Sequence, residues 1–441
     1  MNARWLKLVP SSLRLQIKKR ANLHSVLANA SWLITEKMIR MLVGVIVGTW
    51  VARYLGPTQF GELAYALALT AFFQAFATLG LDGVVVRDIS REPQRANEIL
   101  GTTLWLRIAC GLLAWIVAIG CILIFRPGDT RALILVALIS SGIVFQAADT
   151  IDLWFQSQSQ SRRTVVVKLI ALTISASIKI ILIQVDAPLI AFAAAQVLEL
   201  IIGAIALSMS YRWFRSSGSW AGTISVAKIL LYESWPLLLS GLSVMIYMRI
   251  NQIMLRQIAG EQELGLFAAI LPFIEAWNFL PVTICISFAP LIARKKIENE
   301  AQYIWALQRL FSVLFWLALL IAILMACFSS WIVDLLLGPR FAGSGTILAI
   351  GIFTLVPVFM GVAQGLWIIN ERKPMIFLYN TMVGAIFSVV LNLMLIPKWG
   401  ANGAAIASVA SYFLSAIFAN LLFTPIFFLM QIRAIFFQYV K

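Results

Sequence analysis

The sequence predicts an all-α integral membrane protein with twelve transmembrane helices arranged as two six-helix repeats. Three observations support this fold class. The 441 residues are 61% hydrophobic and only 12% charged, which is far from the composition of a soluble domain. Apolar segments of membrane-spanning length follow one another along almost the whole chain. Two stretches about two hundred residues apart carry the same pattern, which indicates a duplicated unit.

The first repeat is predicted to contain six helices, because six apolar segments of about twenty residues fit into it. Gly56 and Gly61 are expected in the tight turn between its first two helices. We place the spans near 30–53, 58–81, 98–125, 131–157, 163–185 and 187–211.

The second repeat is predicted to contain six more helices, with Gly260 and Gly265 in the turn between the seventh and the eighth. The eighth helix contains Pro272, Pro281 and Pro290, and each proline removes a backbone hydrogen bond and permits a bend. We place the spans near 229–256, 262–291, 303–328, 343–369, 374–398 and 403–428.

The duplication is visible in two pairs of matching stretches. Residues 55–66 and 259–269 each contain two glycines five positions apart, followed by an apolar helix. Leu153-Trp154-Phe155 and Leu366-Trp367-Ile368 are each soon followed by two basic residues. The offsets are 204 and 213 residues. Six helices return the chain to its starting side, so the repeats are expected to be parallel, related by an axis normal to the bilayer, as in many transporters.

This organisation predicts two membrane bundles with short cytoplasmic segments around them. The segments are a basic tail (1–25), an N-terminal bundle (26–211), a linker (212–228), a C-terminal bundle (229–430) and a second tail (431–441).

Lys and Arg residues are distributed unevenly between the two sides of the predicted bundle. Twenty-one lie on the side of the N-terminus, so both termini are predicted to be cytoplasmic. The same excess accounts for most of the net charge of +15, which therefore does not indicate nucleic-acid binding. The basic segment 1–23 is predicted to lie on anionic membrane lipids. The six Lys and Arg residues on the side opposite the N-terminus are Arg53, Arg126, Arg131, Arg256, Arg340 and Lys398.

The sequence lacks the groups that most enzymatic sites require. It has one histidine, His24, in the N-terminal tail, and no GxxxxGK[ST] loop that could hold nucleotide phosphates. Asp149 and Asp152 come closest to a catalytic carboxylate pair. We therefore predict a protein that is not an enzyme and binds no metal or cofactor. The four cysteines lie in apolar spans at no metal-ligand spacing: Cys110, Cys121, Cys285 and Cys327.

Several basic side chains occur at membrane depth, where a charge usually faces a cavity or a partner. Arg40 and Arg249 recur on the first and seventh helices, which correspond between the repeats. The alternative is internal pairing, since Glu36 and Arg40 are four residues apart on one helical face. We predict that five cations line a cavity between the repeats and bind an anionic substrate: Lys37, Arg40, Arg107, Lys179 and Arg249.

Two carboxylates are candidates for ion or proton coupling. Glu275 lies in the middle of the eighth helix with no obvious local partner, and Glu36 lies on the first helix. For Glu275 a structural hydrogen bond is the alternative interpretation.

Stretches in both halves resemble bacterial polysaccharide flippases. In the first half these are residues 30–37, 51–61 and 79–87, and in the second half 249–255, 265–269, 275–277 and 396–405. They are similar to Wzx-type O-antigen and capsule exporters. That superfamily includes the multidrug and toxin extrusion (MATE) pumps and the peptidoglycan-precursor flippases. The resemblance covers residues 25–430 and implies a MATE-like fold.

The resemblance also implies a function. Such proteins move an undecaprenyl-diphosphate-linked oligosaccharide from the cytoplasmic to the periplasmic leaflet of the bacterial inner membrane by alternating access. The implied partners are this lipid-linked substrate, membrane lipids, a polysaccharide polymerase and a chain-length regulator. Arg and Lys suit the oxygens of a diphosphate. The family often has Asp where this chain has Asn251, so no carboxylate role is carried over to that position.

Two other functions stay open at this point. One is a cation-coupled multidrug or toxin exporter of the same superfamily, in which carboxylates would be essential. The other is a membrane enzyme that acts on polyprenyl-linked sugars. Such an enzyme usually needs a long loop with clustered Asp, Arg or His, and the sequence has no such loop.

Overall fold

The computed structural model describes residues 11–214, 219–371 and 373–436. In this part of the chain every regular element is a helix and no strand occurs, which confirms the all-α prediction. Parts of the predicted tails (1–10 and 437–441), Arg215 of the predicted linker and Arg372 of the second matching stretch lie outside the described residues.

The N-half, residues 11–214, contains seven α-helices. The first begins at Ser11, so the described part of the predicted basic tail continues the first membrane helix. The helices are α1 (Ser11–Thr78), α2 (Asp82–Arg91), α3 (Ala96–Phe125), α4 (Thr130–Phe145), α5 (Asp149–Ser157), α6 (Arg162–Gln184) and α7 (Leu189–Phe214), with short 3-10 turns at Pro93–Arg95 and Gln146–Ala148.

The C-half, residues 224–435, contains the remaining helices. Between α15 and α16 the chain forms a π-helical turn at Leu414–Phe418, and 3-10 turns lie at Pro339–Phe341 and Ile352–Thr354. The helices are α8 (Ile224–Ala259), α9 (Glu261–Glu275), α10 (Phe279–Glu298), α11 (Glu300–Cys327), α12 (Ser329–Leu336), α13 (Ser344–Gly351), α14 (Leu355–Asn370), α15 (Pro374–Phe413), α16 (Ala419–Phe423) and α17 (Pro425–Ile435).

Ten segments of the described chain are long and apolar enough to cross a membrane. Two of them, Ser31–Arg91 and Met375–Phe423, are much longer than one span and each covers two of the predicted helices. Each contains a glycine with a non-helical backbone, Gly56 (φ 72°) in α1 and Gly400 (φ 53°) in α15. The backbone leaves the helical conformation at these two positions, so the helices are broken there. Glycine occupies both because other residues rarely adopt such φ values.

Two details differ from the sequence prediction. Gly61 and Gly265 lie inside helices, and only the first glycine of each matching stretch, Gly56 or Gly260, forms the break. The predicted eighth helix is divided into α9 and α10 by a turn at 276–278. Pro281 lies on the third residue of α10, where the missing N–H leaves no helical hydrogen bond unmade.

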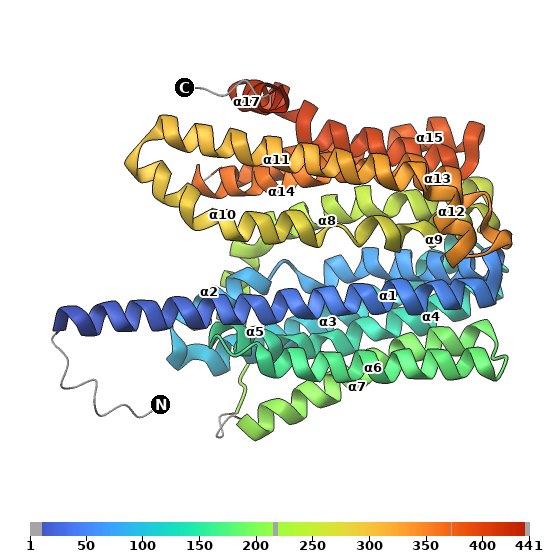
Figure 1. Ribbon diagram of the computed structural model, residues 1–441. Helices are drawn as coiled ribbons and strands as arrows, with labels where there is room; N and C mark the ends of the chain where they lie inside the picture. The colour runs from blue at the N-terminus through green and yellow to red at the C-terminus, as the bar shows by residue number, and fades with distance from the viewer. Residues whose placement is uncertain (1–10, 215–218, 372, 437–441) are drawn as a thin grey trace.

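The two halves lie side by side with their helices roughly parallel, and they meet closely at one end (Figure 1). We call this the closed end; it contains the breaks at Gly56 and Gly260. Here a Cβ atom on Gly61 would lie 1.9 Å from the Glu261 carbonyl oxygen. A Cβ atom on Gly265 would lie 1.8 Å from the Pro57 carbonyl oxygen. The matching glycines of the two repeats thus let the two backbones touch.

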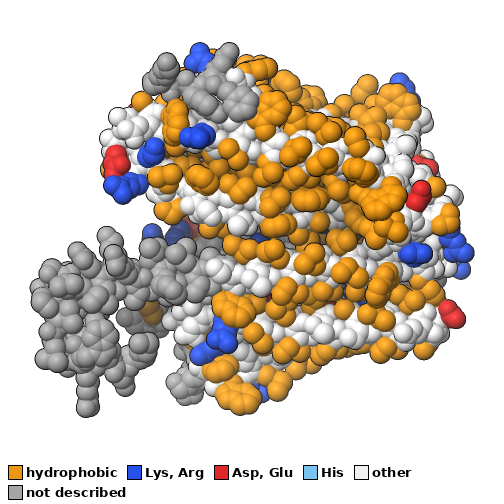
Figure 2. Space-filling model, viewed as in Figure 1, with side chains coloured by type: hydrophobic (Ala, Val, Ile, Leu, Met, Phe, Trp, Pro, Cys, Tyr) orange, Lys and Arg blue, Asp and Glu red, His pale blue; other side chains and the backbone are white. Residues whose placement is uncertain are grey.

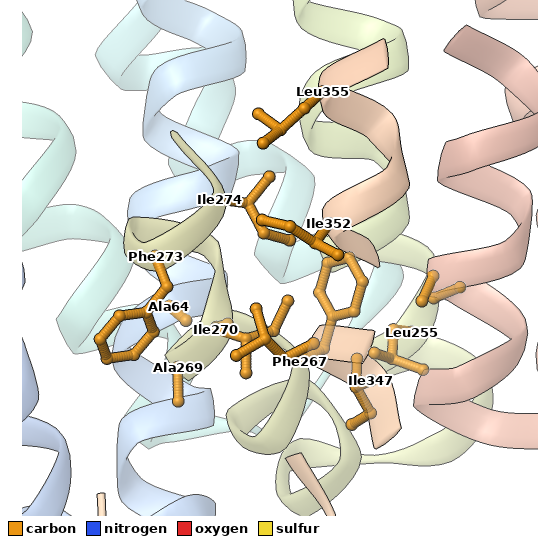
Figure 3. Close-up of a cluster of buried hydrophobic side chains, with 14 of the residues drawn as sticks. Ala64, Leu255, Phe267, Ala269, Ile270, Phe273, Ile274, Ile347, Ile352 and Leu355 are labelled. Carbon is orange, nitrogen blue, oxygen red and sulfur yellow. The ribbon is translucent and has the colours of Figure 1, made fainter. Parts of the chain in front are cut away.

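A buried apolar cluster joins the halves behind this crossing. Figure 3 shows Ala64 of the N-half among side chains of α8, α9 and the region of α13 and α14, including Leu255, Phe267 and Ile270. Toward the opposite end the halves separate, and Figure 2 shows a recess between them. There the first part of α8 still contacts the N-half, through a smaller cluster that includes Val85 and Leu230.

Apolar side chains cover much of both halves on the face that Figure 2 shows. Many large ones are exposed, among them Trp50, Leu113, Ile116, Leu320 and Ile386. A soluble protein seldom exposes so much continuous apolar surface, whereas a membrane protein presents it to lipid.

Candidate functional site

The first charged cluster of the N-half is built around Arg40. Its Nε donates to Glu36 Oε1 at 2.9 Å, one helical turn away, and its Nη1 donates to Glu199 Oε1 at 2.8 Å on α7. Lys179 Nζ lies 3.9 Å from Glu199 Oε2 and donates to Gln196 at 2.9 Å. The pairing of Glu36 with Arg40 was the alternative to a cavity position that the sequence left open, and the structure shows that pair.

A second cluster lies nearer the end of the N-half where α2, α3 and α5 meet. Lys168 Nζ contacts Asp149 at 3.0 Å and Asp152 at 2.6 Å. Buried Arg107 donates to Asp82 at the start of α2. The cations of this cluster are therefore matched by carboxylates.

Two adjoining cavities of about 730 and 680 Å³ connect these clusters. They share Gln74 and Gln146, together with the Asp149–Lys168 ion pair. One extends to Glu36, Arg40 and Glu199, and the other to Asp82, Arg107 and Asp152. The N-half thus contains a polar interior at membrane depth.

The C-half holds a smaller polar site. Arg249 Nη1 lies 3.5 Å from Glu275 Oε1, so the carboxylate that lacked a local partner in the sequence pairs across helices. Glu275 also lines a cavity of about 540 Å³ with Asn278, Ser408 and Tyr412.

Asn251 is part of a buried neutral network beside that cavity. Its amide group donates to Ser408 and accepts from Ser388 and Asn392. These contacts join α8 to both parts of α15.

The five predicted cations are therefore in different environments. Arg40, Lys179 and Arg107 contact carboxylates within the N-half, and Arg249 contacts Glu275 in the C-half. Lys37 is exposed, and no ion pair is found for it among the described residues. Whether any of them binds substrate stays a prediction.

Several carboxylates that hold the cations of these clusters were not among the site residues predicted from the sequence. Glu199 and Asp152 were visible as charges on apolar helices, but neither was a candidate site residue. Asp82, which begins α2, carried no such signal because it follows a glycine turn outside the apolar run.

The closed end contains a third charged group, which links the two halves. Arg256 of the C-half contacts Asp129 of the N-half at 2.9 Å, and Arg126 of the N-half lies 3.5 Å from Glu261 of the C-half. Arg256 also contacts Glu261 at 3.1 Å and lies over the Tyr65 ring at 4.2 Å. Each half therefore offers a cation to a carboxylate of the other. We call these four charged residues the latch.

Asp129 lies between two membrane segments, in the turn before α4. Burial raises the pKa of its carboxyl group, but the Ala132 N–H, Arg256 and Arg126 outweigh this effect. The pKa of Asp129 therefore lies below its ordinary value, and the latch keeps this negative charge at neutral pH.

Comparisons with known proteins agree with this architecture. The capsular polysaccharide biosynthesis protein CapF of Staphylococcus aureus is 21% identical over 396 residues, covering 88% of this chain and 97% of CapF. An uncharacterized membrane protein of Methanocaldococcus jannaschii is 36% identical over 100 residues, which cover 22% of this chain and 19% of that protein.

Two solved structures show the same fold at low sequence identity. The lipid II flippase MurJ in an inward closed conformation gives a TM-score of 0.70 at 12% identity, covering 92% of this chain and 91% of MurJ. An inward-facing MATE multidrug transporter gives 0.64 at 14% identity, covering 89% and 96%. A family model described as "Polysaccharide biosynthesis protein" matches residues 26–296. Because this match spans more than half of the chain, the protein belongs to the polysaccharide biosynthesis protein family.

Proposed function

We propose that this protein is a flippase that moves undecaprenyl-diphosphate-linked oligosaccharide from the cytoplasmic to the periplasmic leaflet of a bacterial inner membrane. The membership in the polysaccharide biosynthesis family carries this proposal. The likeness of its fold to the lipid II flippase supports it. In this role the protein would supply a polysaccharide polymerase and its chain-length regulator with flipped repeat units.

The proposed topology has twelve spans, with both termini in the cytoplasm. The breaks at Gly56 and Gly400 support counting Ser31–Arg91 and Met375–Phe423 as two spans each, which raises ten segments to twelve. The bundles at 26–211 and 229–430 are then six helices each. The closed end faces the periplasm in this topology, and the recess faces the cytoplasm.

In the proposed mechanism the substrate enters from the recess while the latch holds the opposite end shut. Opening the closed end and closing the recess would then expose the substrate to the periplasm, as alternating access requires. The closed end supports this step because the halves meet there through a few ion pairs, one backbone crossing and the apolar cluster behind it, all of which lie along one interface that rigid-body rotation can separate.

In the proposed diphosphate site, phosphate oxygens of the substrate replace the carboxylates that four of the five cations contact in the structure. At 3.5 Å the Arg249–Glu275 contact is long for a charge-assisted hydrogen bond, so phosphate oxygens can replace the carboxylate at modest cost. Lys37 is exposed and ready to meet the substrate. Arg40, Arg107 and Lys179 are held by carboxylates and would need those carboxylates to be protonated or to move.

This exchange gives Glu275 and Glu36 a role in coupling. A proton on Glu275 would free Arg249 for the substrate, and loss of the proton would restore the ion pair. A proton on Glu36 would weaken the hold on Arg40 but leave it on Glu199. Passive movement driven by polymerisation in the periplasm is the alternative energy source. Transport that continues after collapse of the ion gradients would support the passive mechanism.

The test is the pool of lipid-linked oligosaccharide in cells with and without the gene, resolved by leaflet. We expect a completed repeat unit to accumulate on the cytoplasmic leaflet of cells that lack it, with loss of surface polymer. Arg249→Ala and Arg40→Ala at normal protein levels should reproduce this defect. Full surface polymer in both variants would refute the cation assignment while leaving the flippase function open.

A multidrug exporter is the second candidate, favoured by one observation. Carboxylates are as prominent as cations in the N-half cavities, and the fold is also that of MATE transporters. An unchanged lipid-linked pool together with altered drug resistance would support this candidate over the flippase.

A further inference from the structure

A cavity of about 880 Å³ lies in the N-half at the closed end, apart from the cavities already described. Its polar lining comes from the end of the first part of α1, the start of the second part, the start of α4 and the α6–α7 turn. The Tyr54 hydroxyl donates to the Ala187 carbonyl oxygen at 3.0 Å and its ring packs on Phe192, which fixes the α6–α7 turn against α1. The cavity therefore has a rigid wall.

The cavity contains a buried carboxylate with an unused oxygen. The Glu62 side chain is only 12% exposed, and its Oε2 is buried without a hydrogen-bond partner among the described residues. Its nearest cation is Arg131, whose Nη1 lies 3.9 Å from Oε1 and whose side chain is 81% exposed. A buried carboxylate with one long contact is costly unless a further donor meets it.

The internal repeat shows that the fold does not require this carboxylate. Glu62 follows Gly61, and the residue after the matching Gly265 is Leu266. Both helices cross at the glycine in the same way. The N-half therefore has a carboxylate at the position where the C-half has an apolar residue.

The cavity also opens toward the apolar surface. Ile134 and Ile190 line it and are exposed on the lipid-facing side. Its charged residues lie within two turns of the helix ends, which is the depth of lipid head groups. A ligand at this place meets the Glu62 carboxylate inside, Arg131 and the exposed Asp186 nearer the surface, and apolar side chains below.

We propose that this cavity binds the head group of an amine-bearing phospholipid, with phosphatidylethanolamine as its occupant. The ammonium group pairs with the Glu62 carboxylate, the phosphate contacts Arg131, and the acyl chains lie along Ile134 and Ile190. This order of charges matches a phosphoethanolamine group, in which the ammonium and the phosphate are two carbons apart. A purely anionic head group would give the Glu62 carboxylate no donor beyond its long contact with Arg131.

The test uses the full-length protein purified in detergent and exposed to equimolar dioleoyl phosphatidylethanolamine and phosphatidylglycerol. Bound lipids are then counted by native mass spectrometry. We expect phosphatidylethanolamine to be retained about tenfold better, as one charge-assisted hydrogen bond would give. Glu62→Gln should abolish this preference, whereas the matched control Glu92→Gln, exposed at the other end, should keep it.

Other outcomes would separate a ligand site from a structural ion pair. Arg131→Gln, a change of an exposed side chain, should weaken retention of both phospholipids. Soluble phosphoethanolamine at millimolar concentration should not displace the lipid. Displacement by the soluble compound would overturn the lipid assignment in favour of a small amine. Equal retention of the two phospholipids by the unaltered protein, or an unchanged preference in Glu62→Gln, would overturn the site altogether.

Discussion

At the residue scale, the charges inside this protein are mostly neutralised by one another. Spacing within one helix was enough to raise the Glu36–Arg40 pair as an alternative to a cavity position for Arg40. The contact between Arg40 and Glu199 spans 159 residues and depends on how α7 packs against α1, so no local pattern could predict it. The same holds for Arg249 and Glu275, which belong to different helices.

Glu199 is the residue whose loss should matter most in the N-half interior. It is the shared carboxylate of Arg40 and Lys179, and its side chain is only 9% exposed. We expect Glu199→Gln to lower the free energy of unfolding by about 3 kcal/mol, because it leaves two cations without this partner at membrane depth. Thermal unfolding of the purified protein would measure this.

The matched control for Glu199 is Glu298→Gln. Glu298 pairs with Arg294 on an exposed helical surface, where such a pair contributes at most about 1 kcal/mol. Equal melting temperatures for the two variants would show that Glu199 is not the electrostatic centre of the cluster.

At the element scale, helix existence was predictable and helix breaks were less so. The predicted spans fall on helical stretches, although those at 262–291 and 403–428 are interrupted, because long apolar runs are a strong signal. The turn between α9 and α10 was not predicted, although the prolines near it indicated a bend. Proline limits where a helix can continue, but the surrounding packing decides which residues form the turn.

The crossing of the matching helices gives a sharp prediction. Gly265→Ala would place a methyl group 1.8 Å from the Pro57 carbonyl oxygen, so the two halves must move apart. We expect a loss of about 3 kcal/mol, at the upper end of overpacking costs, and a lower yield of folded protein. Gly44→Ala is the control, since a Cβ atom there meets nothing within 4 Å. Similar yields of the two variants would show that the halves do not depend on this contact.

Removing a cation from the latch should let the two halves separate more easily at the closed end. Arg256→Gln removes the cation that contacts Asp129 and Glu261. We expect the distance distribution between spin labels at positions 186 and 342 to extend to longer values, because fewer ion pairs join the halves. Electron paramagnetic resonance on a cysteine-free background measures this. A distribution identical to that of the unaltered protein would leave the backbone crossing as the dominant contact.

The same labels test the charge state of the latch. The pKa of Asp129 is lower in the folded protein than its ordinary value, so its stabilising contribution is present above that value and is lost as the pH falls through the lowered pKa. We therefore expect no change of the Asp129–Arg256 contact between about pH 8 and pH 5. Opening within this interval would point to another titrating group.

At the scale of the whole molecule, the sequence predicted the all-helical class and the family, but not where the charges face. Family resemblance and hydropathy are signals summed over many residues, so a change at one position alters them little. The predicted cation-lined cavity depends on which side chains turn toward the recess and which toward neighbouring carboxylates. That choice is made by tertiary packing, which placed Arg107 against Asp82 inside the N-half.

One labelling experiment can test the proposed orientation of the protein in the membrane. Twenty-one Lys and Arg residues are assigned to the side of the N-terminus and six to the side of the closed end, so the closed end should face the periplasm. On a cysteine-free background, a cysteine at position 186 or 342 should react with an impermeant maleimide in intact spheroplasts. A cysteine at position 299 should react only after the membrane is opened. The reverse pattern would place the recess in the periplasm and would require the proposed direction of transport to be rebuilt from the opposite leaflet.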